Sequence, residues 1–225
     1  MRAMILAAGR GERLRPLTDT MPKPLLQVGG KALIVRLIER LAAAGFGELV
    51  INLGYRGRQI EEALGNGRAF GVSIVYSREP EEALETGGGI FQALPHLSDP
   101  FLVVNGDIAT DFPFAALPKK ISGLAHLVLV PNPAHHLQGD FAWRDGQVQL
   151  EGETRYTFAG IGVYRPALFA DCQPGRFPLA PILRRAIAQG QVSGQPYLGF
   201  WSDIGTLDRL EAFAHYLQRP RGGEL

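Results

Sequence analysis

A short apolar run that ends in two glycines constrains the fold of this chain more than any other feature. Residues 4–8 read as a buried strand, and Gly9 and Gly11 come next. Glycine can adopt a positive φ and lets a ligand approach the backbone. Consecutive N–H groups in such a turn form a concave site for an anion. Because the cations Arg13, Arg15 and Lys23 follow, we predict a site for a group that carries several phosphates.

This strand and turn differ from two common phosphate-binding motifs. No Gly-Lys-Ser/Thr follows the glycines, as a Walker A loop requires, and no x-x-Gly opens a helix after them, as the Rossmann fingerprint requires. The stretch from Leu6 to Leu25 instead resembles the signature of the sugar-1-phosphate nucleotidyltransferases, Leu-Ala-Ala-Gly-x-Gly-x-Arg-Leu-x-Pro-Leu-Thr followed by Pro-Lys-Pro. A tight strand-to-helix turn with solvated arginines is the simpler alternative, but it does not require these glycines, cations and prolines to coincide.

Composition narrows the partners of the chain. The 225 residues carry a net charge of +1, whereas a nucleic-acid binder usually has a strongly basic surface. We therefore expect small-molecule substrates and no nucleic acid. No apolar run approaches the roughly 18 residues of a transmembrane helix, and the run at 4–8 is too short for a signal peptide. The single cysteine, Cys172, cannot form an internal disulfide. We expect a cytoplasmic protein with no membrane partner.

The pattern of apolar residues predicts an α/β fold. Apolar residues at helical spacing predict a helix at 32–44 between apolar strands at 4–8 and 48–53, which is a parallel crossover. Asp145-Gly146 predicts a hairpin and hence a small antiparallel excursion on the sugar side. Further strands are predicted at 72–76, 101–107, 124–130, 157–164 and 197–203, and further helices at 59–64, 90–94, 179–189 and 207–217.

We expect one nucleotidyltransferase domain over residues 1–225. The resemblance implies a Rossmann-like, mostly parallel sheet flanked by helices, similar to the GT-A fold. It also implies a nucleotide-binding part at about 1–110 and a sugar-binding part at about 111–217. The resemblance also implies a short form without the carboxy-terminal domain through which many relatives oligomerise, so we expect a monomer.

Three consecutive glycines, Gly87 to Gly89, form a second unusual stretch. Each loses extra backbone entropy on folding, so we predict close approach to a flat base or ribose. Residues Leu84 to Gly88 match a family segment, and the resemblance implies that this segment lies over the nucleotide base. A flexible loop is the alternative.

Two aspartates complete the predicted site. Asp107 follows an apolar strand, and ligands of parallel sheets bind beyond the carboxyl ends of the strands. Asp203 belongs to Trp-Ser-Asp-Ile-Gly-Thr, which resembles the family motif that supplies a second metal-holding aspartate. The resemblance implies that Asp107 and Asp203 hold Mg²⁺, although a carboxylate that caps the following turn is the simpler alternative for Asp107.

The resemblance also implies roles for individual residues. Arg13 would bind the leaving β,γ-phosphates and Lys23 would neutralise the α-phosphate or the sugar phosphate, so these two are the predicted catalytic residues. The predicted nucleotide-binding residues are Ala8, Gly9, Gly11, Glu12, Arg13, Lys23, Thr86, Gly87, Gly88 and Asn105, and the predicted sugar-binding residues are Asp140, Glu153, Gly160 and Asp203.

One family feature is missing from this sequence. Many relatives carry Val-Glu-Lys-Pro, whose lysine contacts the sugar phosphate, but Leu150-Glu-Gly-Glu-Thr-Arg155 contains no lysine. Either Arg155 replaces that lysine or Lys23 acts alone. For Asp140 and Glu153, a solvated hairpin carboxylate is as good an interpretation as a sugar contact.

The expected reaction joins a nucleoside monophosphate from a nucleoside triphosphate to a sugar-1-phosphate and releases pyrophosphate. Within the family, the chain most resembles the short bacterial group of N-acetylmuramate-1-phosphate uridylyltransferases, which act in peptidoglycan recycling. This resemblance is carried by the short length and by the segments Glu85 to Phe91, Asn132 to His136 and Gly139 to Phe141. Mannose-1-phosphate with GTP, or glucose-1-phosphate with TTP or UTP, are the alternatives. A non-catalytic sugar-nucleotide sensor is an alternative of another class. Such a protein would lack some of the residues that bind phosphate and metal, yet Arg13, Lys23, Asp107 and Asp203 are all present.

Replacing Asp107 tests the metal assignment. We expect Asp107→Asn to abolish pyrophosphate release while the thermal unfolding transition stays close to that of the unmodified protein, because the amide keeps the shape of the carboxylate but loses its charge. Near-normal turnover in this variant would contradict a metal-holding role.

Overall fold

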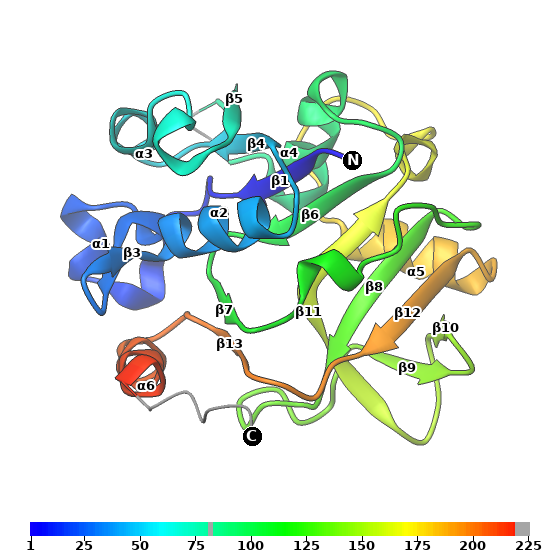
Figure 1. The fold of residues 1–225 in the computed structure, drawn as a ribbon. Helices are drawn as coiled ribbons and strands as arrows, with labels where there is room; N and C mark the ends of the chain where they lie inside the picture. Colours follow the sequence, from blue (N-terminus) through cyan, green and yellow to red (C-terminus); the bar gives the residue numbers. More distant parts are fainter. Residues whose placement is uncertain (81–82, 219–225) are drawn as a thin grey trace.

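A single twisted sheet forms the centre of the molecule, and helices cover both of its faces (Figure 1). The computed structural model describes residues 1–80 and 83–218. Within them the strands of the sheet lie in the order β5 (Ser73–Arg78), β4 (Glu48–Leu53), β1 (Ala3–Leu6), β6 (Phe101–Asn105), β11 (Arg155–Tyr164), β8 (Ala125–Val130), β12 (Val192–Pro196), β10 (Gln147–Gln149) and β9 (Phe141–Arg144).

The direction of the strands divides the sheet into two parts. Strands β5, β4, β1 and β6 are parallel to one another, so their carboxyl ends share one edge. Strand β11 runs antiparallel to β6 and to β8, and β12 is parallel to β8. The expected α/β class with a Rossmann-like parallel part is confirmed, and the antiparallel part is larger than the small excursion that the sequence predicts.

Helices and two small sheets complete the fold. The helices are α1 (Leu17–Thr20), α2 (Leu33–Ala43), α3 (Gly57–Leu64), α4 (Glu85–Ala93), α5 (Ala180–Ala188) and α6 (Leu207–Gln218). Strands β2 (Gln27–Val28) and β3 (Lys31–Ala32) form a hairpin, and β7 (Ile108–Thr110) pairs with β13 (Trp201–Asp203). None of the helices in the described ranges combines the length and the apolar character needed to cross a membrane.

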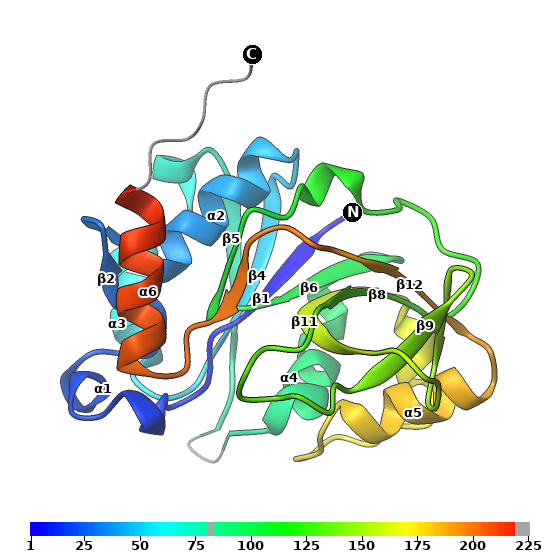
Figure 2. The same ribbon diagram turned by 90° about the horizontal axis from the view of Figure 1, so that it is seen from below.

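Alternation along β1 distributes its side chains between two cores, because successive residues of a strand point to opposite faces. Ile5 packs in a buried cluster with Leu41 of α2 and Ile60 of α3. Met4 packs on the other face with Ile90 of α4 and with residues of α5. Figure 2 shows α2 on one side of the sheet and α4 with α5 on the other. The sheet is therefore the middle of three layers.

The structure corrects two local predictions. The glycines at 87–89 lie inside α4, which begins at Glu85 rather than at position 90. Strand β12 has no counterpart among the predicted strands, and the predicted strand at 197–203 is reduced to β13 at its end. The sequence of β12, Val-Ser-Gly-Gln-Pro, contains glycine and proline, which are rare in strands, so pairing with β8 and not local preference makes it a strand.

Truncation of Leu41 tests the packing of α2 on the sheet. Leu41 is 0% exposed, so we expect Leu41→Ala to lower the free energy of unfolding by about 2–5 kcal/mol, through lost burial and the cavity left behind. Denaturant titration measures this change. Leu198, which is 78% exposed, supplies the control: Leu198→Ala should change stability by no more than about 0.5 kcal/mol. Equal effects of the two variants would contradict this account of the core.

Candidate active site

A cavity of about 530 Å³ lies at the edge where the parallel strands end. Residues that follow β1, β4, β5 and β6 all reach it, as expected for ligand sites of parallel sheets. Of the residues predicted from the sequence, those that line the cavity are Ala8, Gly9, Gly11, Glu12, Arg13, Lys23, Thr86, Asn105 and Asp107. The glycine-rich turn, the first aspartate and the start of α4 therefore face one common space.

Contacts with the following segment hold the glycine-rich turn in shape. Gly11 has φ 68°, and an added Cβ would lie 3.0 Å from the Lys23 Cβ and 3.1 Å from the Thr18 Cγ2. The Thr18 hydroxyl donates a hydrogen bond to the Gly11 carbonyl over 3.0 Å. A larger residue at position 11 would face both backbone strain and a steric clash. The turn therefore needs glycine here for its own geometry.

Lys23 and Asp107 form an ion pair inside the cavity. The Lys23 Nζ donates to the Asp107 Oδ2 over 2.5 Å. The Lys23 side chain is only 11% exposed and that of Asp107 is 31% exposed, so neither charge is fully solvated. The predicted phosphate-binding cation and the predicted metal-binding carboxylate are thus direct neighbours.

Asp203 lies beside Asp107 because β13 pairs with β7. The register sets Asp203 opposite Ile108, and the Ile204 N–H donates to the Asp107 carbonyl over 2.8 Å. The Asp203 Oδ1 accepts a hydrogen bond from the Arg209 Nη1 over 2.5 Å. Asp203 is not among the residues that line the cavity, but its neighbour Gly205 is. The backbone of Asp203 therefore lies beside that of Asp107, next to the rim of the cavity.

The two carboxylates fit a magnesium site that is completed by substrate. Mg²⁺ is commonly held by one or two carboxylates together with phosphate oxygens and water. In residues 1–80 and 83–218, no group of three or more acidic, His or Cys side chains could hold a metal without such help. The donor set present, Asp107 and Asp203, is hard and oxygen-rich. It suits Mg²⁺ that arrives with a triphosphate, and such an ion would share Asp107 with Lys23 and Asp203 with Arg209.

Gly87 and Gly88 do not line the cavity, although the sequence predicts them at the nucleotide. A Cβ at Gly87 would lie 2.5 Å from the Phe177 ring, and one at Gly88 would lie 2.2 Å from the Gly175 carbonyl oxygen. The Gly88 N–H also donates to the Phe177 carbonyl over 3.0 Å. The missing side chains therefore let α4 pack against the segment at 175–177, and a ligand is not needed to explain them.

Two polar residues that the sequence analysis missed also line the cavity, Asn52 and Glu79. The Asn52 Nδ2 donates to the Glu79 Oε1 over 2.6 Å, and its Oδ1 accepts from the Ala7 N–H over 2.7 Å. The Glu79 Oε2 accepts from the Leu84 N–H over 2.9 Å. This network ties the ends of three segments together. An amide inside the apolar run of β4 is the signal that would have revealed it, because buried polar groups need partners.

Two of the predicted sugar-binding residues, Asp140 and Glu153, lie apart from the cavity. Asp140 and Glu153 line a separate open hollow of about 870 Å³. Both Asp140 oxygens already have partners: Oδ2 accepts from the Phe158 N–H over 2.8 Å, and Oδ1 lies 3.1 Å from the His136 Nε2. Gly160 lies in an irregular part of β11 with φ 68°, and its added Cβ would lie 2.5 Å from the Asn105 Nδ2. Gly160 therefore makes room for Asn105.

Arg155, the possible replacement for the missing family lysine, already has several partners in the protein. Its guanidinium donates to main-chain carbonyls: Nε to Gln138 over 3.0 Å, Nη1 to Leu150 over 2.8 Å, and Nη2 to Asp140 over 2.8 Å. The side chain thus holds the 138–140 segment against the end of β10. Binding a phosphate would cost these hydrogen bonds, which favours the alternative that Lys23 acts alone.

Comparison with known proteins agrees with this geometry. A family model described as nucleotidyl transferase matches residues 2–136, and the chain belongs to this family. An N-acetylmuramate alpha-1-phosphate uridylyltransferase from Neisseria meningitidis is 55% identical over 94% of this chain and 96% of that protein. A protein of the same name from Caulobacter vibrioides is 37% identical over 90% of this chain and 91% of that protein.

The fold also has a close structural counterpart. A Bacillus anthracis structure assigned to a glucose-1-phosphate thymidylyltransferase superposes with a TM-score of 0.87 at 22% identity and covers 100% of this chain and 98% of that chain. The family resemblance of the signature, the fold class and the expectation of a nucleotidyltransferase enzyme are thereby confirmed. The binding roles of individual residues stay predictions.

Substitution of Gly88 tests whether packing explains the glycines of α4. Alanine is favoured over glycine in a helix by about 1 kcal/mol, but here the added Cβ would press on the Gly175 carbonyl. We expect Gly88→Ala to lower the free energy of unfolding by about 1–3 kcal/mol, measured by denaturant titration. Gly47→Ala is the control, because a Cβ at Gly47 meets no atom within 4 Å. A Gly88→Ala protein as stable as the unmodified one would rule out the packing explanation.

Proposed function

We propose that this protein transfers a uridylyl group from UTP to N-acetylmuramate 1-phosphate, giving UDP-N-acetylmuramate and pyrophosphate. The observation that carries the choice of substrates is the 55% identity to the Neisseria meningitidis enzyme over nearly the whole length of both chains. The ion pair of Lys23 with Asp107 in the cavity, with Asp203 beside it, supports the type of reaction.

The chemistry requires positioning and charge neutralisation. An oxygen of the sugar-1-phosphate attacks the α-phosphorus of the triphosphate, a new P–O bond forms, and the bond from the α-phosphorus to the β-phosphate oxygen breaks to release pyrophosphate. The attacking phosphate is already ionised at neutral pH, so no protein base has to remove a proton. The barrier comes mainly from bringing two anions together, which cations and fixed dipoles lower.

The residues of the cavity divide this work between them. Arg13 binds the departing phosphates, and Lys23 neutralises the α-phosphate or the incoming sugar phosphate from its place beside Asp107. Backbone groups at Ala8, Gly9 and Gly11 cradle the nucleotide. Asp107 and Asp203 are the residues that would hold Mg²⁺, which would supply further positive charge to the phosphates.

The setting follows from this reaction. We place it in the cytoplasm, in peptidoglycan recycling, where the sugar phosphate and UTP would both be supplied. The single Cys172 agrees with a reducing compartment.

A substrate grid tests the proposal. Pyrophosphate release is measured with Mg²⁺ for each common nucleoside triphosphate against N-acetylmuramate 1-phosphate, mannose 1-phosphate and glucose 1-phosphate. We expect turnover with UTP and the muramate sugar, because the chain matches uridylyltransferases for this sugar over its length. Asp107→Asn protein purified in the same way measures contaminating activity. Turnover with GTP and mannose 1-phosphate instead would overturn the choice of substrates, and no turnover with any pair would favour a sensor.

A further inference from the structure

Arg209 reaches the rim of the active-site cavity from helix α6. Its side chain is only 17% exposed, and two of its nitrogens have partners in the protein. Nη1 donates to the Asp203 Oδ1 over 2.5 Å and lies 2.8 Å from the His135 Nε2, and Nε donates to the Thr206 Oγ1 over 3.3 Å. These contacts hold the guanidinium in one orientation. Arg209 is therefore a fixed cation and not a solvated surface charge.

Gly205 places the Arg209 guanidinium next to that of Arg13. A Cβ at Gly205 would lie 2.6 Å from the Arg209 Nη2 and 2.8 Å from the Arg13 Nη2. Both nitrogens therefore lie within 2.8 Å of the position that a Gly205 Cβ would occupy. Gly205 itself lines the cavity. The absence of a side chain at Gly205 lets two arginines from distant parts of the chain meet there.

The two guanidiniums have donor groups to spare at this point. Within the described part of the chain, the Arg209 Nη2 makes no hydrogen bond, and Arg13 makes neither a hydrogen bond nor an ion pair through its guanidinium. Two like charges this close repel each other unless an anion lies between them. Asp203 balances one of the two. The second positive charge therefore has no anionic partner among the described residues. A phosphate would supply one, because its oxygens match the forked N–H donors of arginine.

We propose that Arg209 is a substrate-binding residue and that Arg209 and Arg13 together grip one phosphate group at Gly205. This inference rests on the proposed function, because it assigns a ligand to the same site. The phosphate has two possible sources, the sugar-1-phosphate and the triphosphate with its pyrophosphate product. The sequence lacks the lysine with which many relatives contact the sugar phosphate, and Arg155 donates to main-chain carbonyls instead. Arg209 supplies a fixed cation near Asp203 that could take the place of that lysine.

The experiment compares Arg209→Ala and Arg209→Lys with the unmodified enzyme on the substrate pair that the unmodified enzyme accepts. Initial rates give KM and kcat for each substrate with the other held at saturation. We expect Arg209→Ala to raise KM for one substrate by about 10- to 100-fold, the loss that removal of charged hydrogen bonds produces. Arg209→Lys should recover part of it, since lysine keeps the charge but not the fork. Calorimetric binding of inorganic pyrophosphate without Mg²⁺ gives a second readout that does not depend on turnover.

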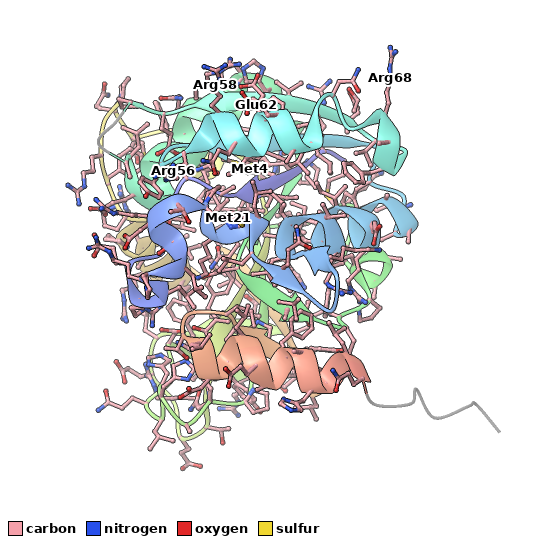
Figure 3. The ribbon with its side chains drawn as sticks, turned by 90° about the vertical axis from the view of Figure 1, so that its left-hand side faces the viewer. Met4, Met21, Arg56, Arg58, Glu62 and Arg68 are labelled. Carbon is pink, nitrogen blue, oxygen red and sulfur yellow. The ribbon has the colours of Figure 1, made fainter. Side chains whose placement is uncertain are left out.

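Arg58→Ala is the matched control. It removes the same charge from a side chain that is 90% exposed, and Figure 3 shows Arg58 and Glu62 on α3, on the opposite side of the molecule from α6. We expect its kinetic constants and pyrophosphate affinity to be unchanged. Thermal unfolding of all variants reports any loss of fold, and Arg209→Lys keeps the test usable if Arg209→Ala is unstable.

The outcomes separate the two sources of phosphate and the two hypotheses. A raised KM for the sugar-1-phosphate alone would show that Arg209 and Arg13 bind the sugar phosphate. A raised KM for the triphosphate, together with weaker pyrophosphate binding, would show that they bind the leaving group. Unchanged KM values and pyrophosphate affinity, with only kcat or stability lowered, would overturn the inference and leave Arg209 as a support for Asp203. Failure of the proposed function is distinct from this, because it appears as no turnover of UTP with N-acetylmuramate 1-phosphate by the unmodified enzyme.

Discussion

The pairing of β13 with β7 is the interaction on which the candidate active site depends. Hydrogen bonds of an antiparallel ladder are directional, so the register fixes the neighbours of each residue. The bond from the Ile204 N–H to the Asp107 carbonyl brings the last part of the chain back to the edge of the parallel strands. Through this contact Gly205 and Arg209 come to lie beside Arg13, which follows the glycine-rich turn. Without it, the two aspartates would belong to unconnected loops.

Apolar burial holds this polar arrangement in place. Phe213 of α6 packs in one buried cluster with Ile204 and with Leu14, which belongs to the signature stretch. The rings of Phe200 and Tyr216 stack with their centroids 3.6 Å apart. Helix α6 thus packs against the segment that follows the glycine-rich turn. A site whose cations and carboxylates are already paired and oriented needs little rearrangement as charge moves during the reaction.

Much of the fold could be predicted from the sequence, because strongly periodic segments keep their structure in almost any context. The helix at 32–44 and the strands around it are observed as α2, β1 and β4. Strand β12 could not be predicted, since its residues become a strand only by pairing with β8. The packing role of the glycines in α4 could not be predicted either, and the sequence suggested close approach of a ligand instead. The segment at 175–177 that Gly87 and Gly88 contact is remote in sequence, so no local pattern reveals the contact.

The sequence by itself determined the signature and its chemistry: the glycine-rich turn, the cations after it, the two aspartates and hence the family. These depend on residue types and short spacings. Only the tertiary structure decided which charges meet. Lys23 and Asp107 are 84 residues apart in the chain, Arg155 is held by carbonyls, and Arg209 reaches Arg13 across Gly205. Such contacts depend on strand order and register, which arise from packing of the whole chain and are not encoded in any local pattern.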